Sequence, residues 1–118
     1  MEAFADFDEY QELALRTASP TSTESERSLL TSAALGLSGE SGEIADHVKK
    51  IIYHGHPLDD ETRDKIAKEI GDILWYCAVG ARGIGVSLSE IASANVEKLR
   101  KRYPEGFSTE KSLNRPHG

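Results

Sequence analysis

The chain has 118 residues, a formal net charge of −6 at pH 7 and one cysteine, Cys77, so it fits a single domain without an intrachain disulfide. Its acidic residues are spread along the sequence, which argues against the broad basic surface of a nucleic-acid-binding protein. It has no basic leader before an apolar stretch and no run of 18 apolar residues, which predicts no membrane partner and a reducing, cytoplasmic location.

Apolar residues recur at intervals of three and four along the chain, which predicts helices and an all-α fold. The first helix is expected over residues 4–17, because the Pro-containing segment 19–22 follows it. The second is expected from a cap near Ser25 through about Tyr53, with Gly55 as a C-terminal stop.

The third helix is expected to begin near Asp59 or Asp60, whose carboxylates suit a helix N-terminus, and to end at about Gly83. The fourth is expected over residues 87–103, because Pro104 closes it. These segments predict an antiparallel four-helix bundle.

We expect one helical domain over residues 1–107 and a loosely ordered tail over residues 108–118. The fourth helix carries an apolar stripe, made of Leu88, Ile91, Ala92, Val96 and Leu99. Asn95 lies within this stripe, so its amide is expected to point inward and to need hydrogen-bond partners.

Two acidic pairs interrupt the apolar stripes of the second and third helices. They are Glu40 with Glu43 and Glu69 with Asp72. Residues three apart share a helix face, and both pairs lie roughly 15 Å from the turn between the helices, so we expect the pairs to face each other. Four such carboxylates repel unless protons or cations neutralise them, and an all-oxygen cluster favours Mg²⁺ or Mn²⁺. The alternative is a solvated polar face with salt bridges.

Three glycines, Gly36, Gly39 and Gly42, recur at intervals of three beside the first acidic pair. Each costs about 1 kcal/mol relative to alanine in a helix interior, so something must offset that cost. Two interpretations remain open. The glycines allow close helix packing, or they let a partner helix or a ligand approach the backbone.

Several motifs occur in a fixed order, in residues 35–43, 69–76, 95–99, 102–104 and 106–107. In these motifs the chain resembles the MazG-like family of all-α nucleoside triphosphate pyrophosphohydrolases, whose signature is a Glu-x-x-Glu helix followed by a Glu-x-x-Asp helix. The resemblance implies that both acidic pairs hold Mg²⁺ and that Asn95 and Lys98 help to bind the substrate. Many relatives carry a further Glu where this chain has Gly39.

The chemistry of the acidic pairs agrees with this resemblance. Hydrolysis of a triphosphate between its α and β phosphates requires charge neutralisation and an activated water, which carboxylate-held Mg²⁺ supplies. Glu40 or Glu43 is the expected residue that orients or deprotonates the water, although a base and a metal ligand look alike in sequence.

Further side chains are candidates for substrate binding. Lys98 and Arg102 lie one turn apart and suit a polyphosphate, with surface salt bridges as the alternative for Arg102. Lys50 lies on the same side as Glu43 and has the same two interpretations. Tyr76, one turn from Asp72, is a candidate for stacking on a nucleobase.

Other polar residues have weaker assignments. His47 is expected to orient a metal-bound water or to bond a ligating carboxylate, and Trp75 is expected in the core. The first helix offers candidates for base or sugar selectivity, namely Tyr10, Gln11, Arg16 and Thr17.

The resulting hypothesis is a Mg²⁺-dependent nucleoside triphosphate pyrophosphohydrolase that acts as a homodimer or homotetramer, because one short bundle leaves little wall around a nucleotide. The alternatives are a phosphoribosyl-ATP pyrophosphohydrolase and a non-catalytic helical protein that binds metal or regulates a partner.

Overall fold

The computed structural model describes residues 3–115, within which the chain forms helices and no β-strand. The helices are α1 (Phe7–Leu15), α2 (Glu26–His54), α3 (Asp60–Gly83), α4 (Leu88–Arg102) and α5 (Thr109–Leu113). The predicted all-α class is therefore confirmed. The outermost parts of the predicted domain and tail, residues 1–2 and 116–118, lie outside the described range. No helix in residues 3–115 is long and apolar enough to cross a membrane.

The bounds of α2 and α3 follow from their caps, as the sequence predicts. The Ser25 hydroxyl accepts a hydrogen bond from the Ser28 N–H at 3.0 Å, and the Asp59 carboxylate accepts one from the Thr62 N–H at 2.9 Å. Gly55 ends α2 with a φ of 71°, in the left-handed region that glycine adopts at little cost. α4 likewise begins after its cap, Ser87.

α1 is shorter than predicted at both ends. It begins at Phe7, because the Asp6 carboxylate accepts a hydrogen bond from the Glu9 N–H at 2.8 Å and so caps the helix there. It ends at Leu15, and the Thr17 hydroxyl donates to the Ala14 carbonyl at 2.7 Å. Side-chain bonds of this kind compete with continued helix, which explains the early stop.

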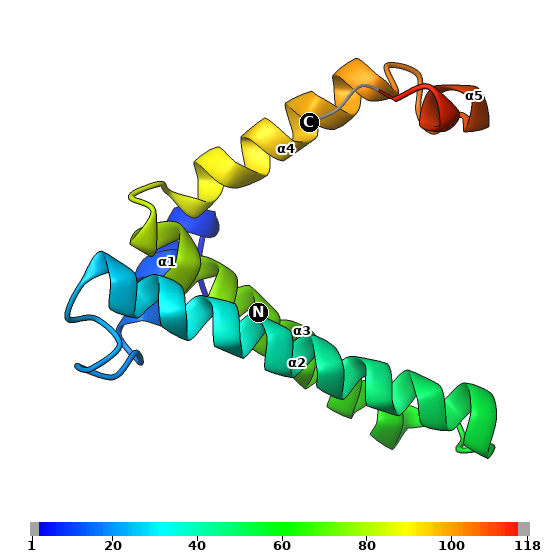
Figure 1. Ribbon diagram of the computed structural model, residues 1–118, viewed down its shortest axis with the longest axis horizontal. Helices are drawn as coiled ribbons and strands as arrows, with labels where there is room; N and C mark the ends of the chain where they lie inside the picture. The colour runs from blue at the N-terminus through cyan, green and yellow to red at the C-terminus, as the bar shows by residue number, and fades with distance from the viewer. Residues whose placement is uncertain (1–2, 116–118) are drawn as a thin grey trace.

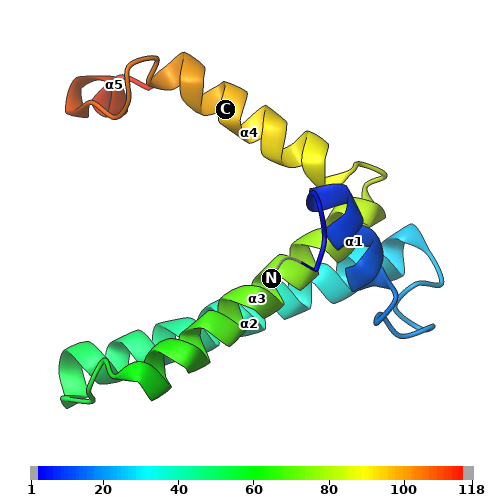
Figure 2. The same cartoon turned by 180° about the vertical axis from the view of Figure 1, so that it is seen from behind.

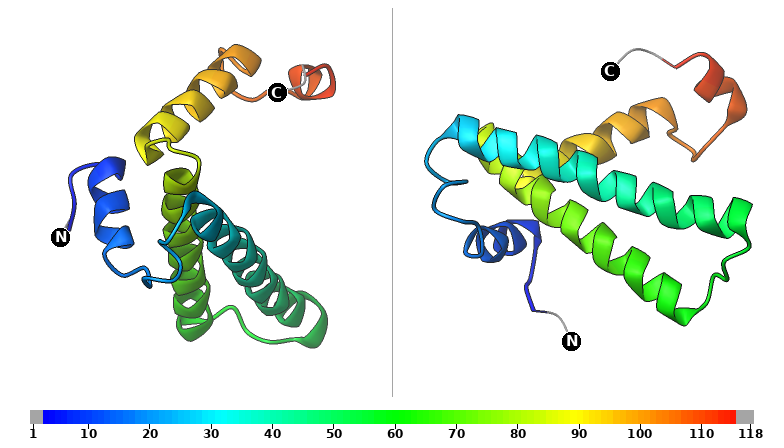
Figure 3. Two further views of the ribbon diagram at one scale, coloured as in Figure 1. Left: turned by 60° about the vertical axis from the view of Figure 1, so that its left-hand side comes forward. Right: turned by 60° about the horizontal axis from the view of Figure 1, so that its bottom comes forward.

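The antiparallel hairpin of α2 and α3 is the centre of the molecule (Figures 1 and 2). α1 packs against the end of the hairpin where α2 begins and α3 ends. α4 starts at that same end and then leads away from the hairpin (Figure 3). The radius of gyration is 17.2 Å, whereas a compact chain of this length has about 13.5 Å. The chain is therefore more extended than a compact domain of its length, because α4 leads away from the hairpin.

The core lies at the α1 end of the hairpin. Its buried apolar residues are Ala14, Leu29, Ala33, Ala78, Val79, Ala81 and Leu88. Trp75 packs against both halves of this core, and its indole N–H donates to the Ala14 carbonyl at 3.0 Å and to the Thr17 hydroxyl at 2.8 Å. The predicted core position of Trp75 is confirmed, and the ring also fastens α1 to α3.

The predicted burial of the α4 stripe is wrong for its outer part. Ile91, Val96 and Leu99 are 39%, 47% and 41% exposed, and Asn95 is exposed instead of pointing into the core. The periodicity correctly identifies an apolar face, but within residues 3–115 α4 packs mainly against α1 and α3, near its start, so most of that face is left exposed.

The tail is more regular than expected. Within the predicted loosely ordered segment, residues 109–113 form α5, which Ser108 caps by accepting from the Lys111 N–H at 3.1 Å. Leu113 is 80% exposed, so α5 contributes little to the core.

We expect Trp75→Phe to lower the free energy of unfolding by about 1–3 kcal/mol, because it removes the indole donor and part of the ring from the junction of the two core halves. Thr17→Val, which keeps its shape and loses only the hydroxyl, should cost about 1 kcal/mol or less. Urea unfolding followed by circular dichroism measures both. Equal stability of Trp75→Phe and the parent would show that the indole does not hold α1.

Candidate functional site

The two acidic pairs lie on the facing helices α2 and α3, as the sequence predicts. Glu40 and Glu69 are half-buried between the helices, and Glu43 and Asp72 are exposed beside them. The other three carboxylates are all close enough to Glu40 to act on its ionisation. The fold therefore gathers four acidic side chains midway along the hairpin.

Two carboxylate oxygens of this cluster are buried without a hydrogen-bond partner, one on Glu40 and one on Glu69. The other oxygen of Glu69 lies 3.2 Å from Nε2 of His47, which comes from α2. His47 thus bonds a carboxylate of the cluster, as predicted, and holds Glu69 in one orientation. Unpartnered buried carboxylate oxygens are costly, so they mark the place where a counter-charge is missing.

Burial raises the pKa of Glu40 above its ordinary value, and the negative charges of Glu43, Asp72 and Glu69 raise that pKa further. The protein therefore pays free energy to keep Glu40 ionised at neutral pH. A bound cation would lower this cost.

The fit of the cluster to a divalent cation is partial. Within residues 3–115, no three His, Cys, Asp or Glu side chains are arranged so that they could hold a metal ion together. The donor set consists of carboxylate oxygens, which suit Mg²⁺, and the two unpartnered oxygens come from opposite helices. The residues present fit the cation in charge and chemistry.

We expect Glu40→Gln to raise the melting temperature of the metal-free protein at pH 7, because the amide has the size of the carboxylate and no charge to repel. A carboxyl group whose pKa is raised in the folded state costs stability only when it is ionised, so the penalty appears as the pH rises through that pKa. The gain should therefore shrink at pH 4. Differential scanning calorimetry in EDTA at both values measures it, and a lower melting temperature for Glu40→Gln at pH 7 would contradict the repulsion.

Lys50 is already paired within α2. Its ammonium group lies 2.8 Å from one oxygen of Asp46, and that of Lys49 lies 3.1 Å from the other. The hydrogen bonds from these two lysines, with that of Lys50 first, hold the pKa of Asp46 at about 2. Sequence reasoning missed Asp46, although its spacing of four from Lys50 is the usual signal of such a pair.

Tyr76 is half-buried, and its ring lies against the backbone of α2 at Gly36. A Cβ atom at Gly36 would overlap this ring, so glycine is required for the contact. The ring also meets Trp75 edge to face, with ring centroids 5.0 Å apart. By contrast, a Cβ atom at Gly39 or Gly42 would meet nothing within 4 Å. Close packing within the chain explains Gly36, whereas the backbone beside Glu40 and Glu43 is open to a ligand or a partner.

The predicted substrate residues of α4 are not brought to the acidic cluster by a single chain. Asn95 and Lys98 are exposed, and Arg102 is half-buried near the end of the helix. α4 leads away from the hairpin before it reaches these positions (Figure 3).

Two of the first-helix candidates for base selectivity have structural roles instead. Gln11 is buried, with its amide bonded to backbone groups of α3 and α4, and Thr17 bonds Trp75. Burial raises the pKa of the Tyr10 hydroxyl, and the nearby negative charge of Asp72, a member of the cluster, raises that pKa further. Arg16 is exposed.

A hollow of about 470 Å³ lies away from the acidic cluster, between α1 and α4. Its apolar lining comes from Phe7, Ala92 and Val96, and its charged groups are Asp6, Glu97 and Arg100. The acidic cluster, and not this hollow, has the chemistry for phosphoryl transfer.

Comparison with known proteins gives a consistent result. A family model described as the MazG nucleotide pyrophosphohydrolase domain matches residues 29–107, which include all but the first three residues of α2 and the whole of α3 and α4. The Gene 37 protein of Mycobacterium phage L5 is 40% identical over 78 residues, which cover 65% of this chain and 68% of the phage protein. No solved structure matches the chain.

Proposed function

The chain belongs to the MazG nucleotide pyrophosphohydrolase family, and on this premise we propose that it is a Mg²⁺-dependent nucleoside triphosphate pyrophosphohydrolase. Water would attack the α-phosphorus of the triphosphate. One phosphorus–oxygen bond forms, the anhydride bond between the α and β phosphates breaks, and the products are a nucleoside monophosphate and pyrophosphate.

The observation that supports this proposal most strongly is the pair of buried, unpartnered oxygens of Glu40 and Glu69 on opposite helices, with Glu43 and Asp72 beside them. Salt bridges do not account for this cluster, because within residues 3–115 the basic group that pairs with it is the His47 ring, on Glu69. A divalent cation held by these residues would supply the missing positive charge and a ligand position for the phosphates.

Glu40, Glu43, Glu69 and Asp72 are the residues proposed to hold Mg²⁺, with Mn²⁺ as a substitute. Bound there, the cation would neutralise phosphate charge and lower the pKa of a water. Glu40 or Glu43 would accept the proton that this water loses and release it to solvent. His47 keeps Glu69 oriented throughout.

We further propose that a second copy of the chain completes the site, in a homodimer or homotetramer. Asn95 and Lys98, the proposed phosphate contacts, are exposed, as is much of the apolar stripe of α4, and α4 itself leads away from the hairpin that carries the cluster. On α2, Leu35 and Ile52 are 71% and 65% exposed. A partner would bury these surfaces, so sedimentation equilibrium should give a dimer or a tetramer and no stable monomer.

The test of the activity is incubation of the purified protein with each ribo- and deoxynucleoside triphosphate and Mg²⁺, followed by separation of the products. Monophosphate with pyrophosphate is the expected result, and the order of rates would rank the bases and sugars. Diphosphate with phosphate would refute the cleavage position. No turnover of any triphosphate would refute the substrate class and direct the same assay to phosphoribosyl-ATP.

A further inference from the structure

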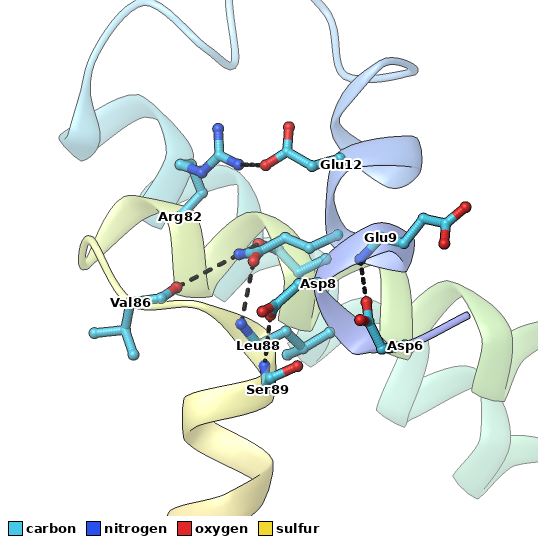
Figure 4. A network of polar contacts seen from close by, with 10 residues as sticks. Asp6, Asp8, Glu9, Glu12, Arg82, Val86, Leu88 and Ser89 are labelled. Carbon is cyan, nitrogen blue, oxygen red and sulfur yellow. Dashed lines mark hydrogen bonds and ion pairs between the residues drawn. The ribbon is translucent and has the colours of Figure 1, made fainter. Parts of the chain in front are cut away.

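The start of α4 is capped by side chains of α1. The Leu88 N–H donates to Oε1 of Gln11 at 3.1 Å, and the Ser89 N–H donates to Oδ1 of Asp8 at 3.0 Å. Figure 4 shows the Asp8 carboxylate directed at Ser89. The cap residue of α4 itself satisfies only the Glu90 N–H. Two of the N–H groups that a helix leaves without internal partners are therefore satisfied by a different helix.

Gln11 joins three segments at once. Its amide nitrogen donates to the Ala78 carbonyl on α3 at 3.1 Å and to the Val86 carbonyl in the turn before α4 at 3.5 Å. Gln11 is only 3% exposed, and among residues 3–115 it is the one polar residue that is buried. A buried amide is costly unless it is fully bonded, so its bonds fix the turn and the first residues of α4 to α1 and α3.

The hydrogen bonds of Gln11 and Asp8, together called the clasp, hold only the start of a long helix. α4 spans 15 residues, about 22 Å, and it leads away from the hairpin after its first turns. The turn before it contains Gly85, with a φ of 73°, in the left-handed region that glycine adopts at little cost. A tilt of about 10° at the first turn would move the far end of a helix this long by about 4 Å.

We infer that Gln11 and Asp8 are positioning residues, which set the direction of α4 so that Asn95 and Lys98 reach the triphosphate held at the acidic cluster of a second copy of the chain. This inference rests on the proposed function for the identity of the substrate. α1 lies outside residues 29–107, so the clasp joins a helix outside the part matched by the family model to α4, which lies within it. Loss of the clasp should weaken substrate binding more than it slows the chemical step.

The direction of α4 can be measured without any activity. Spin labels on Lys68→Cys in α3 and Lys101→Cys in α4, in a Cys77→Ala background, report the distance between the helices by pulsed electron paramagnetic resonance. Dilution with unlabelled chains removes distances between subunits. Gln11→Met keeps the length of the side chain and removes its hydrogen bonds, and it should broaden a distance distribution that is narrow in the parent.

Matched variants distinguish the loss of the clasp from a general weakening of the contacts of α1. Glu12→Gln breaks the exposed ion pair of α1 with Arg82 and should leave the distribution narrow. Asp8→Ala should broaden it, whereas Asp8→Asn, which keeps the acceptor oxygen, should restore it. The Asp8 variants also serve if Gln11→Met fails to fold, because Asp8 is exposed.

Kinetics complete the test. Gln11→Met and Asp8→Ala should raise KM for the preferred triphosphate by about tenfold while kcat changes less, and Asp8→Asn should return KM toward the parent value. If the distance distribution stays as narrow in Gln11→Met and Asp8→Ala as in the parent, the positioning role is overturned. The same holds if the distribution broadens but KM does not change. A parent protein without hydrolytic activity would instead refute the proposed function, and the distances would still show whether the clasp directs α4.

Discussion

Glu43→Gln is expected to lower kcat for triphosphate hydrolysis by at least about a hundredfold, because it removes one charge from the cluster that is proposed to hold Mg²⁺ and to accept the proton of the attacking water. Glu43 is exposed at the edge of the cluster, so the folded structure should tolerate the amide. Asp72→Asn removes a charge from the opposite helix and should have a comparable effect at low Mg²⁺ concentration.

The dependence on Mg²⁺ distinguishes a ligand from a base. A variant that has lost only a ligand should regain part of its activity as the Mg²⁺ concentration rises, whereas a variant that has lost the base should not. Pyrophosphate release measured over a Mg²⁺ series decides between these roles for Glu43 and Asp72. Glu61→Gln, in an exposed ion pair with Lys65 on α3, is the matched control and should behave as the parent. Full activity of both Glu43→Gln and Asp72→Asn would show that the site lies elsewhere.

Gly36→Ala is expected to destabilise the fold by about 1–3 kcal/mol, although alanine favours helix, because the added methyl group overlaps the Tyr76 ring. Gly39→Ala on the same helix meets open space and should stabilise the protein by about 1 kcal/mol. The two substitutions are thus expected to change the free energy of unfolding in opposite directions, because the Tyr76 ring lies against Gly36 and not against Gly39.

A double-mutant cycle tests this cause. In a Tyr76→Ala background the overlap is absent, so Gly36→Ala should become stabilising by about 1 kcal/mol, as at Gly39. Chemical denaturation of the four proteins in the cycle gives the coupling. If Gly36→Ala stabilises the parent chain as well, the ring of Tyr76 does not occupy the place assigned to it.

The central hairpin could be predicted from the sequence because its signals are local. Ser25, Gly55 and Asp59 act within a few residues of themselves, and the spacing of the acidic pairs follows from the helical repeat. The grouping of Glu40 with Glu69 needs only two helices and one turn, which is why the position of the candidate site can be inferred from the sequence alone.

The course of α4 could not be predicted in the same way. An apolar stripe shows that a helix has a face to cover, but it does not show whether the covering element belongs to the same chain, and this is why Asn95 was expected inside. The bonds of Gln11 join positions 67 to 77 residues apart. No local pattern in the sequence distinguishes such a glutamine from one on the surface.

Trp75 gives the protein a built-in optical reporter. It is the single tryptophan of the chain, and its indole N–H is bonded to the last turn of α1. Its fluorescence emission therefore depends on whether α1 is packed against α3. The far-ultraviolet ellipticity of the chain depends mainly on the long helices α2 and α3. Release of the N-terminal helix and melting of the hairpin can thus be followed separately in the unlabelled protein.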